Sequence, residues 1–267
     1  MIEAYSTLAL CLLSSVIVLT LSWAVYLKTG EASFVDVVWA VLTAIFSIYL
    51  LAGNHTVELR FWLLSTMISA WCLRLSTHLI FRLRTTGEDT RYKRMKEKWG
   101  DKSRKKFFFF FQAQALFAVV FALPFLKAGE SGNPINAFDY AGILVWLTGF
   151  CVCSISDYQL TRFKLDSSGN MKVCRSGLWK YSRHPNYFGE WMVWTGYSIF
   201  GLQTDNGALL LAVPVLLYVM ITRVSGSSHI EKAKLRTANA EYTQYINSTS
   251  SFFPWFPKKP SLPNNSL

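Results

Sequence analysis

The stretch YSRHPNYFGEWMVW, residues 181–194, places several polar side chains at the edge of an apolar run. Pro185 suits the first turn of a helix, where a missing N–H group does no harm. Asn186 and Glu190 lie four residues apart, so a helix that begins near Pro185 puts both on one face, with the Tyr187 hydroxyl beside them. An amide and a carboxylate on one face can both donate and accept hydrogen bonds, which makes this face a candidate site for a polar ligand.

A second set of ionisable residues lies nearer the N-terminus, within apolar stretches. In WCLRLSTHLIFR, Arg74, His78 and Arg82 recur every four residues and form one stripe along a helix, while Asp36 begins another apolar run. An ionisable group that faces lipid costs at least about 2.5 kcal/mol near the centre of a span. We therefore expect Asp36, Arg74 and His78 to lie within side-chain reach of one another. The plain structural alternative is that Asp36 pairs with Arg74 and that Arg82 extends to the interface.

The elements that carry these residues are predicted to be transmembrane helices. Hydrophobic residues make up 52% of the chain and charged residues only 16%, which is typical of an integral membrane protein. Most of the apolar windows approach the roughly 20 residues that cross a bilayer, and the last two are short. The windows cover residues 5–27, 34–52, 60–81, 107–126, 139–158, 187–203 and 208–223. We expect an all-α, multi-pass bundle of about seven transmembrane helices.

Lysine and arginine predict how the chain is oriented. They concentrate in loop 82–106, in loop 160–185 and in the tail from residue 223, so these segments are expected in the cytosol and the N-terminus outside. The expected organisation is a transmembrane domain over residues 1–225 and a cytosolic tail, 226–267, that packs on it. The expected location is an integral, multi-pass position in the bacterial inner membrane or the endoplasmic reticulum.

With this orientation, the polar residues at the ends of the spans gather near the cytosolic face. Asp157 closes the fifth window and Arg223 ends the seventh, while Asn186 and Glu190 begin the sixth. Polar groups from five helices at a similar depth favour one cavity that opens to the cytosol.

Composition also excludes some partners. The net charge of +11 does not indicate nucleic-acid binding, because the basic residues are divided among apolar spans and do not share one soluble face. The five cysteines lie mostly inside apolar runs and lack zinc-type spacing, so we expect no metal site. The expected partners are the lipid bilayer and a lipidic small molecule, and the sequence does not fix the oligomeric state.

Loop 82–106 allows two interpretations. Its many basic residues suit anionic lipid headgroups, each worth about 1 kcal/mol near the surface. The mixture of Glu88, Asp89, Arg91 and Tyr92 suits recognition of a phosphate-bearing ligand instead.

Taken together, these motifs resemble the DUF1295 family, the membrane relatives of steroid 5-alpha-reductases. The resemblance covers nearly the whole chain, and the segment RHPNYFG is also similar to isoprenylcysteine carboxyl methyltransferases and related lipid methyltransferases. The supporting pieces are GLWKYSRHPNYFGEWMVWTGY at 177–197, DVVW at 36–39, WCLRLSTHLIFR at 71–82, GEDTRY at 87–92, SDYQLTRFK at 156–164, VSG at 224–226 and EYTQYINSTSSFFPWFP at 241–257.

The resemblance implies an NADPH site on the cytosolic side and a lipidic substrate that enters from the bilayer. The dinucleotide contacts it implies are Asn186, Tyr187, Glu190, Asp157, Arg162 or Lys164, Arg223, and Tyr242 or Tyr245. Arg183 and His184, beside the start of the same helix, are added as cofactor contacts, with Arg183 facing phosphate. In the animal steroid enzymes a tyrosine that polarises the substrate ketone follows the histidine of the third helix, where this chain has Leu79.

The expected activity is hydride transfer from NADPH to a C=C bond of a steroid-like or isoprenoid-like lipid. The candidate catalytic residues are Tyr187, Glu190, Asp36 and His78, each able to supply a proton near a conjugated carbonyl. Two alternatives remain open. One is an S-adenosylmethionine-dependent methyltransferase acting on a lipid or prenylated substrate, and the other is a membrane protein without catalysis.

The charge distribution predicts that cysteines placed in loop 82–106, in loop 162–183 and in the C-terminal tail react only with reagents that reach the cytosol. Accessibility labelling of intact cells with an impermeant maleimide measures this. Strong labelling of any of the three segments from outside would contradict the orientation.

Overall fold

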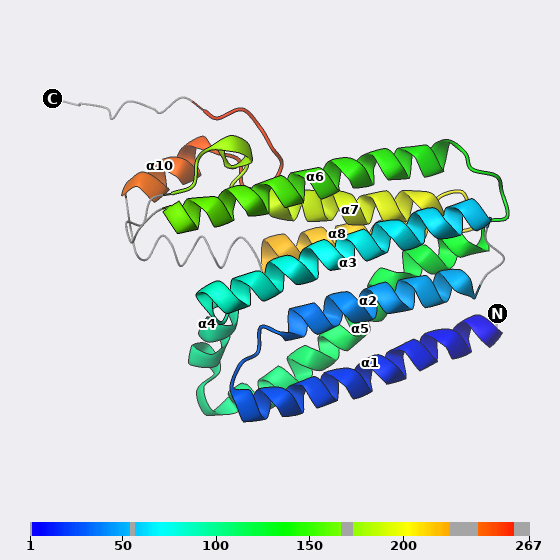
Figure 1. Ribbon diagram of the computed structural model, residues 1–267, viewed down its shortest axis with the longest axis horizontal. Helices are drawn as coiled ribbons and strands as arrows, with labels where there is room; N and C mark the ends of the chain where they lie inside the picture. Colours follow the sequence, from blue (N-terminus) through cyan, green and yellow to red (C-terminus); the bar gives the residue numbers. More distant parts are fainter. Residues whose placement is uncertain (1, 54–56, 167–172, 225–239, 259–267) are drawn as a thin grey trace. The chain divides into compact units, whose positions relative to one another are not determined.

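The computed structural model describes residues 2–53, 57–166, 173–224 and 240–258, and its regular elements there are helices (Figure 1). The part of the sequence motif VSG beyond Val224, and residues 226–239 of the expected tail, lie outside these ranges. The main helices are α1 (Ile2–Thr29), α2 (Val35–Ala52), α3 (Glu58–Thr86), α4 (Thr90–Trp99), α5 (Ser103–Glu130), α6 (Ala137–Asp166), α7 (Pro185–Gly201), α8 (Ala212–Val219) and α10 (Ala240–Ser248). Short 3₁₀ turns cover Gly100–Lys102, Gly177–Lys180 and Gly207–Leu211, and a π-helical turn covers Met220–Val224.

The helices form an all-α membrane bundle. Five helical segments are long and apolar enough to cross a bilayer, namely Tyr5–Thr29, Val35–Ala52, Glu58–Thr86, Thr90–Glu130 and Ala137–Asp166. A shorter apolar helical stretch, Gly207–Arg223, matches the seventh expected window, and the 17-residue α7 matches the sixth. Large apolar side chains such as Leu13, Ile17 and Leu21 are exposed along α1, as expected of a lipid-facing surface.

Two helix ends differ from the expectation. Helix α6 continues to Asp166 and does not close at Asp157, and the expected loop 82–106 contains the end of α3 and all of α4. Hydropathy marks where apolar side chains stop, whereas a helix runs on until its backbone hydrogen bonding is interrupted. Helix α3 ends at Thr86. The next residue, Gly87, has a φ of 70°, a value that does not occur in a right-handed helix.

The contacts within the chain divide it into two compact units. Unit 1 comprises residues 1–142 and 197–213, and unit 2 comprises residues 143–196 and 214–267. The described part of the tail, 240–258, therefore belongs to unit 2.

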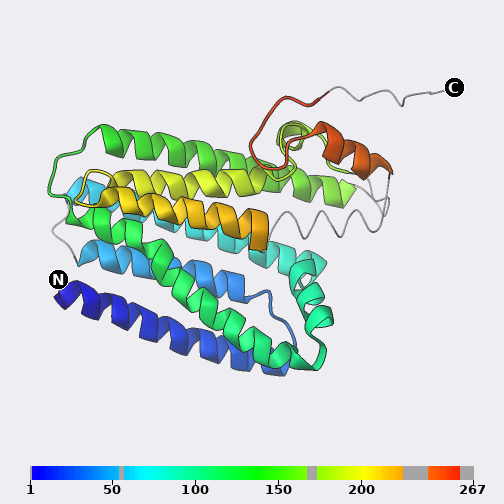
Figure 2. The ribbon, with the colours of Figure 1, turned by 180° about the vertical axis from the view of Figure 1, so that it is seen from behind.

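Helix α5 is the centre of unit 1, because it packs against both α1 and α2, while α2 also packs against α3. Figure 2 shows α5 lying across α2 and reaching α1. Ala115, Ala118 and Ala122 are fully buried on α5, and such small side chains let helices approach closely where lipid provides no hydrophobic drive. Phe107 and Phe111 extend the same buried face toward the α4 end.

A buried ion pair holds the opposite end of unit 1. Arg60 on α3 donates to Asp139 on α6 at 2.8 and 2.9 Å, and both side chains are 0% exposed. The same guanidinium donates to the carbonyl oxygens of Ser131 and Asn133 at 2.9 and 3.0 Å. Gln203 completes the group by donating to Asp139 at 3.4 Å. One arginine thus donates to several main-chain carbonyls of the α5–α6 connection as well as to Asp139.

Helices α6 and α7 of unit 2 touch through their backbones. A methyl group added at Gly189 would lie 2.5 Å from the backbone nitrogen of Cys153, and one added at Gly149 would lie 2.6 Å from the Gly189 carbonyl oxygen. These glycines therefore set the separation of α6 and α7 and thereby place the polar side chains at their ends.

Replacing Arg60 by alanine should lower the free energy of unfolding by about 3–5 kcal/mol, because the buried Asp139 carboxylate would lose its counter-charge and buried carbonyls would lose their donor. Thermal unfolding in detergent measures the loss. The matched control is Lys127→Ala, which breaks a pair with Glu130 whose side chains are 32% and 37% exposed; it should cost no more than about 1 kcal/mol. If both variants lost the same free energy of unfolding, the buried pair would contribute no more to stability than the exposed pair.

Candidate functional site

The start of α7 has the local structure that the sequence predicts. The helix begins at Pro185, and the His184 carbonyl accepts the first helical hydrogen bond from Phe188 at 3.1 Å. The Ser182 hydroxyl accepts from the His184 backbone N–H at 3.1 Å and donates to the Phe252 carbonyl at 2.8 Å. The entry to α7 is therefore fixed by short-range bonds and by the tail.

Asn186 and Asp157 form the polar centre of unit 2. The Asn186 side-chain amide donates to a carboxylate oxygen of Asp157 on α6 at 3.0 Å, and Asp157 is buried. Among the described residues, the amide oxygen of Asn186 is buried without a hydrogen-bond partner. Because the NH₂ group must face the carboxylate, this oxygen is left as an acceptor that points away from Asp157. A buried, unused acceptor indicates a place where a ligand donor fits.

The other predicted α7 residues lie beside this pair. Glu190 and Tyr187 are both half-buried, and Glu190 follows Asn186 by one helical turn. The rings of His184 and Tyr187 stack with centroids 5.5 Å apart. The structure thus brings Asn186 together with Asp157 and leaves Tyr187 and Glu190 on neighbouring positions of the same helix.

The predicted cofactor residues Arg183 and Tyr245 have structural partners. The Arg183 guanidinium donates to the carbonyls of Ile246 and Thr249 at 2.7 and 2.8 Å. The Tyr245 hydroxyl donates to the Trp179 carbonyl at 2.6 Å. Burial is the largest effect on the Tyr245 hydroxyl and raises its pKa above the ordinary value of 10.0, although the charges of Arg183 and Arg175 lower it. These contacts hold the tail on the α7 entry, and the cofactor roles of both residues stay predictions.

Three predicted phosphate contacts are exposed cations of unit 2. Arg162 and Lys164 lie on the last turns of α6, and Arg223 lies in the π-helical turn after α8. The Arg162 side chain is 61% exposed, and its 3.8 Å approach to Asp166 is a weak surface pair. All three are thus accessible, whereas Tyr242 is buried.

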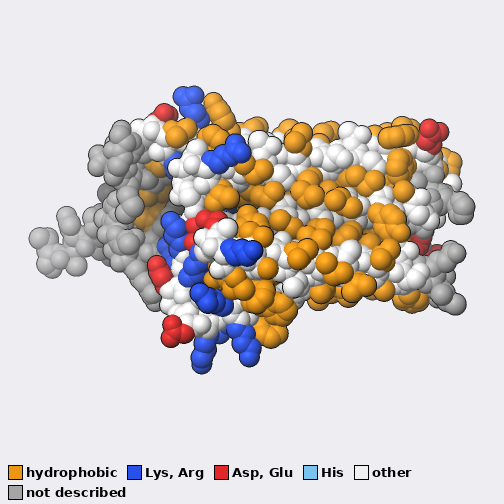
Figure 3. Space-filling view, turned by 60° about the horizontal axis from the view of Figure 1, so that its bottom comes forward, with side chains coloured by type: hydrophobic (Ala, Val, Ile, Leu, Met, Phe, Trp, Pro, Cys, Tyr) orange, Lys and Arg blue, Asp and Glu red, His pale blue; other side chains and the backbone are white. Residues whose placement is uncertain are grey.

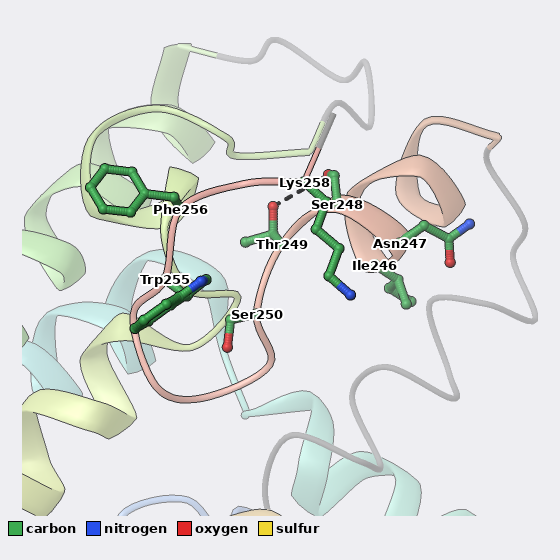
Figure 4. A pocket seen from close by; sticks show the side chains of 8 residues that line it. All are labelled: Ile246, Asn247, Ser248, Thr249, Ser250, Trp255, Phe256 and Lys258. Atoms are coloured by element: carbon green, nitrogen blue, oxygen red, sulfur yellow. Dashed lines mark hydrogen bonds between the residues drawn. The ribbon is translucent and has the colours of Figure 1, made fainter. Parts of the chain in front are cut away.

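A surface pocket of about 280 Å³ lies against the end of α10 (Figure 4). Beside it, the Lys258 backbone N–H donates to the Ser248 carbonyl at 2.8 Å. It is lined by Ile246, Asn247, Ser248, Thr249, Ser250, Trp255, Phe256 and Lys258. No sequence pattern indicates this pocket, because it forms only when the tail folds back on itself.

In unit 1, the structure gives Asp36 two partners from α4. Tyr92 donates to one carboxylate oxygen at 2.6 Å, and Arg91 donates to the other at 3.0 Å. Both residues belong to the motif GEDTRY, which the sequence analysis singled out. Nothing in the spacing of this motif predicted a contact with Asp36. Arg74 and His78 are half-buried on α3, and their proximity to Asp36 stays a prediction.

Asp89 joins this group to the end of α3. Arg82 donates to it at 2.6 Å and Arg91 at 2.9 Å, so Arg82 does more than extend to the interface. The residues Arg82, Asp89, Arg91, Asp36 and Tyr92 are called the Asp36 network below. Burial would raise the pKa of Asp89, but the charges of Arg91 and Arg82 and hydrogen bonds from Arg91 outweigh burial and lower it from 3.8 to about 2.

Further bonds tie the same loop to the α1–α2 connection. The Asp89 backbone N–H donates to the Ser33 hydroxyl at 2.8 Å, and the Ala32 N–H donates to Glu88 at 3.0 Å. Lys96 donates to Glu88 at 2.6 Å. Glu88 and Asp89 therefore make their contacts to other groups of the protein. Among the residues that the structure describes, no cluster of three or more His, Cys, Asp or Glu side chains is arranged to hold a metal.

The fold and these clusters define a multi-pass, all-α membrane protein with polar side chains collected at helix ends. Residues 22–249 match the family described as "Protein of unknown function (DUF1295)", and the chain belongs to that family.

Two kinds of relatives are similar to the chain. Uncharacterized protein C594.04c of Schizosaccharomyces pombe is 25% identical over 277 residues, which cover 91% of this chain and 78% of the relative. Human 3-oxo-5-alpha-steroid 4-dehydrogenase 1 is 38% identical over 67 residues, or 25% of this chain and 26% of that enzyme. Steroid 5-alpha-reductase DET2 of Arabidopsis thaliana is 34% identical over 70 residues, covering 26% and 27%. The similarity thus spans about a quarter of these reductases. No solved structure matches the chain.

Replacing Asp89 by asparagine should lower the free energy of unfolding by about 2 kcal/mol at neutral pH, since the depressed pKa measures how strongly the fold favours the charged carboxylate. Asparagine can still accept the bond that begins α4. Because the folded pKa is about 2 and the ordinary value 3.8, the contribution is complete above about pH 4 and is lost as the pH falls toward 2.

Urea unfolding in mixed micelles at several pH values tests this. The exposed control Asp101→Asn should stay within about 0.5 kcal/mol of the parent protein. A deficit in Asp89→Asn that persists undiminished at pH 3 would contradict the assignment.

Proposed function

We propose that the protein is an NADPH-dependent reductase that transfers hydride to a C=C bond of a steroid-like or isoprenoid-like lipid. The observation that supports this most is the buried, unused amide oxygen of Asn186, at the start of the helix that carries Tyr187 and Glu190. Partial similarity to steroid 5-alpha-reductases supports the reaction class.

The polar residues of unit 2 fit the nicotinamide end of such a cofactor. A carboxamide carries an N–H donor, which the Asn186 oxygen can accept, and Asp157 fixes the amide in the orientation that presents this oxygen. The bound cofactor supplies the hydride. The sulfonium centre of S-adenosylmethionine, the reactive end of that cofactor, itself carries no N–H donor for this acceptor. The exposed cations Arg162, Lys164 and Arg223 are suited to the phosphates.

The chain must also donate a proton to the substrate and exclude water from the site. Tyr187 and Glu190 are the proposed donors, because both are half-buried on the helix that begins at the Asn186–Asp157 pair. Asp36 is less suited, since both of its carboxylate oxygens already accept hydrogen bonds from Tyr92 and Arg91. His78 stays a candidate for the wall of the substrate site. The apolar surfaces of the helices suit delivery of a lipidic substrate from the bilayer.

Detergent-solubilised protein should be stabilised against heat by NADPH, and not by S-adenosylmethionine. A ligand at 100 times its dissociation constant stabilises by about 2.7 kcal/mol, which a thermal-shift assay resolves. Asn186→Ala should lose at least about tenfold in NADPH affinity, because a donor of the ligand would lose its acceptor.

The matched control is Asn247→Ala, which removes an exposed amide from α10 and should leave NADPH binding unchanged. Glu190→Gln should reduce turnover more than binding if Glu190 supplies the proton. Stabilisation by S-adenosylmethionine without stabilisation by NADPH would replace the reductase by a lipid methyltransferase.

A further inference from the structure

The charged residues between α3 and α5 separate into two sets. The acids of the first set, Glu88 and Asp89, are bonded to Lys96, Arg82 and Arg91, and their side chains are only 10% and 8% exposed. They meet the α1–α2 connection through Ala32 and Ser33. These acids therefore neutralise cations inside the protein and contribute little charge to its surface.

The second set faces outward and is almost entirely basic. Eight lysine and arginine residues between 84 and 106 are exposed, against two exposed acids, Glu97 and Asp101. The eight are Arg84, Lys93, Arg94, Lys98, Lys102, Arg104, Lys105 and Lys106, called the basic surface below. On the face drawn in Figure 3, lysine and arginine side chains gather at one end of a surface covered by hydrophobic side chains.

The basic surface adjoins apolar side chains that are suited to lipid. Phe109, three residues after Lys106, is 60% exposed, and Phe81 near the end of α3 is 46% exposed. The Lys106 ammonium lies 5.7 Å from the centre of the Trp99 ring. Below this surface, Tyr92 and Phe107 belong to the buried core, so one face of α4 packs on the core while the charged face is solvated. An amphipathic helix with aromatic neighbours is typical of the membrane interface.

We propose that the basic surface binds the headgroups of anionic phospholipids in the adjoining leaflet. Its charge is complementary to such headgroups, and it continues directly from the exposed apolar side chains of α3 and α5. The mixed charges that suggested a phosphate-bearing soluble ligand are instead bonded inside the protein, which leaves an extended basic surface along α4 and the start of α5. This inference does not depend on the proposed reductase activity.

The test compares spin-labelled phosphatidylglycerol and phosphatidylcholine in bilayers that contain the full chain. Electron paramagnetic resonance gives their relative association constant, and we expect a preference for phosphatidylglycerol of about threefold or more that falls with salt. The variant K93Q/R94Q/K98Q/K105Q removes half of the basic surface and should clearly lower the preference. The matched control K93R/R94K/K98R/K105R keeps the charge at the same positions and should keep the preference.

Three results would overturn the proposal: equal association of the two lipids with the parent protein, a glutamine variant that retains the preference, or a control that loses it. Thermal unfolding confirms that each variant is folded, and the pairs K93Q/R94Q and K98Q/K105Q replace the fourfold variant if it is not. Inorganic pyrophosphate, titrated at constant ionic strength, distinguishes a soluble phosphate ligand. If it displaces the spin-labelled phosphatidylglycerol, the surface binds free phosphates and the lipid assignment is wrong.

Discussion

Polar groups in an apolar bundle must find their hydrogen-bond partners within the chain, because the hydrocarbon of a bilayer provides none. Arg60 meets this constraint with a carboxylate and several main-chain carbonyls, all in one buried group. Outside the apolar windows, Arg183 also donates to main-chain carbonyls, those at the end of α10. In both cases a guanidinium, with five donors in a fixed plane, closes a connection whose backbone would otherwise be unsatisfied.

The same constraint separates residues that maintain the fold from residues available for chemistry. Asp36 is a candidate catalytic acid by sequence, and Asp89 lies in a segment that suited a phosphate-bearing ligand, yet both are bonded within the Asp36 network. Asn186 differs, because its amide donates to Asp157 while its buried oxygen has no partner in the described part of the chain. The amide oxygens of Gln112 and Gln114 on α5 are also buried without a partner, so Asn186 is set apart by its bond to the buried carboxylate of Asp157.

Sequence alone predicts the helical membrane fold and the start of α7, because hydropathy and the position of Pro185 are local signals. It also brings Asn186 and Asp157 into one candidate site through the family resemblance. It does not predict that Tyr92 and Arg91 bond Asp36, since their separation of more than 50 residues leaves no pattern in spacing. The extension of α6 to Asp166 is missed for another reason: apolarity reports the lipid boundary, whereas a polar helical turn continues beyond it.

Position along α7 links packing to the candidate site. Gly189 lies between Asn186 and Glu190, and it is the residue whose missing side chain allows α7 to touch α6 at Cys153 and Gly149. The polar face and the packing contact therefore occupy the same two turns of one helix. Any displacement of α7 at Gly189 also moves the Asn186 amide relative to Asp157. Their hydrogen bond is 3.0 Å long and weakens if it is lengthened. The close contact of two glycines thus holds the Asn186 amide in a defined direction, which the proposed carboxamide site would require.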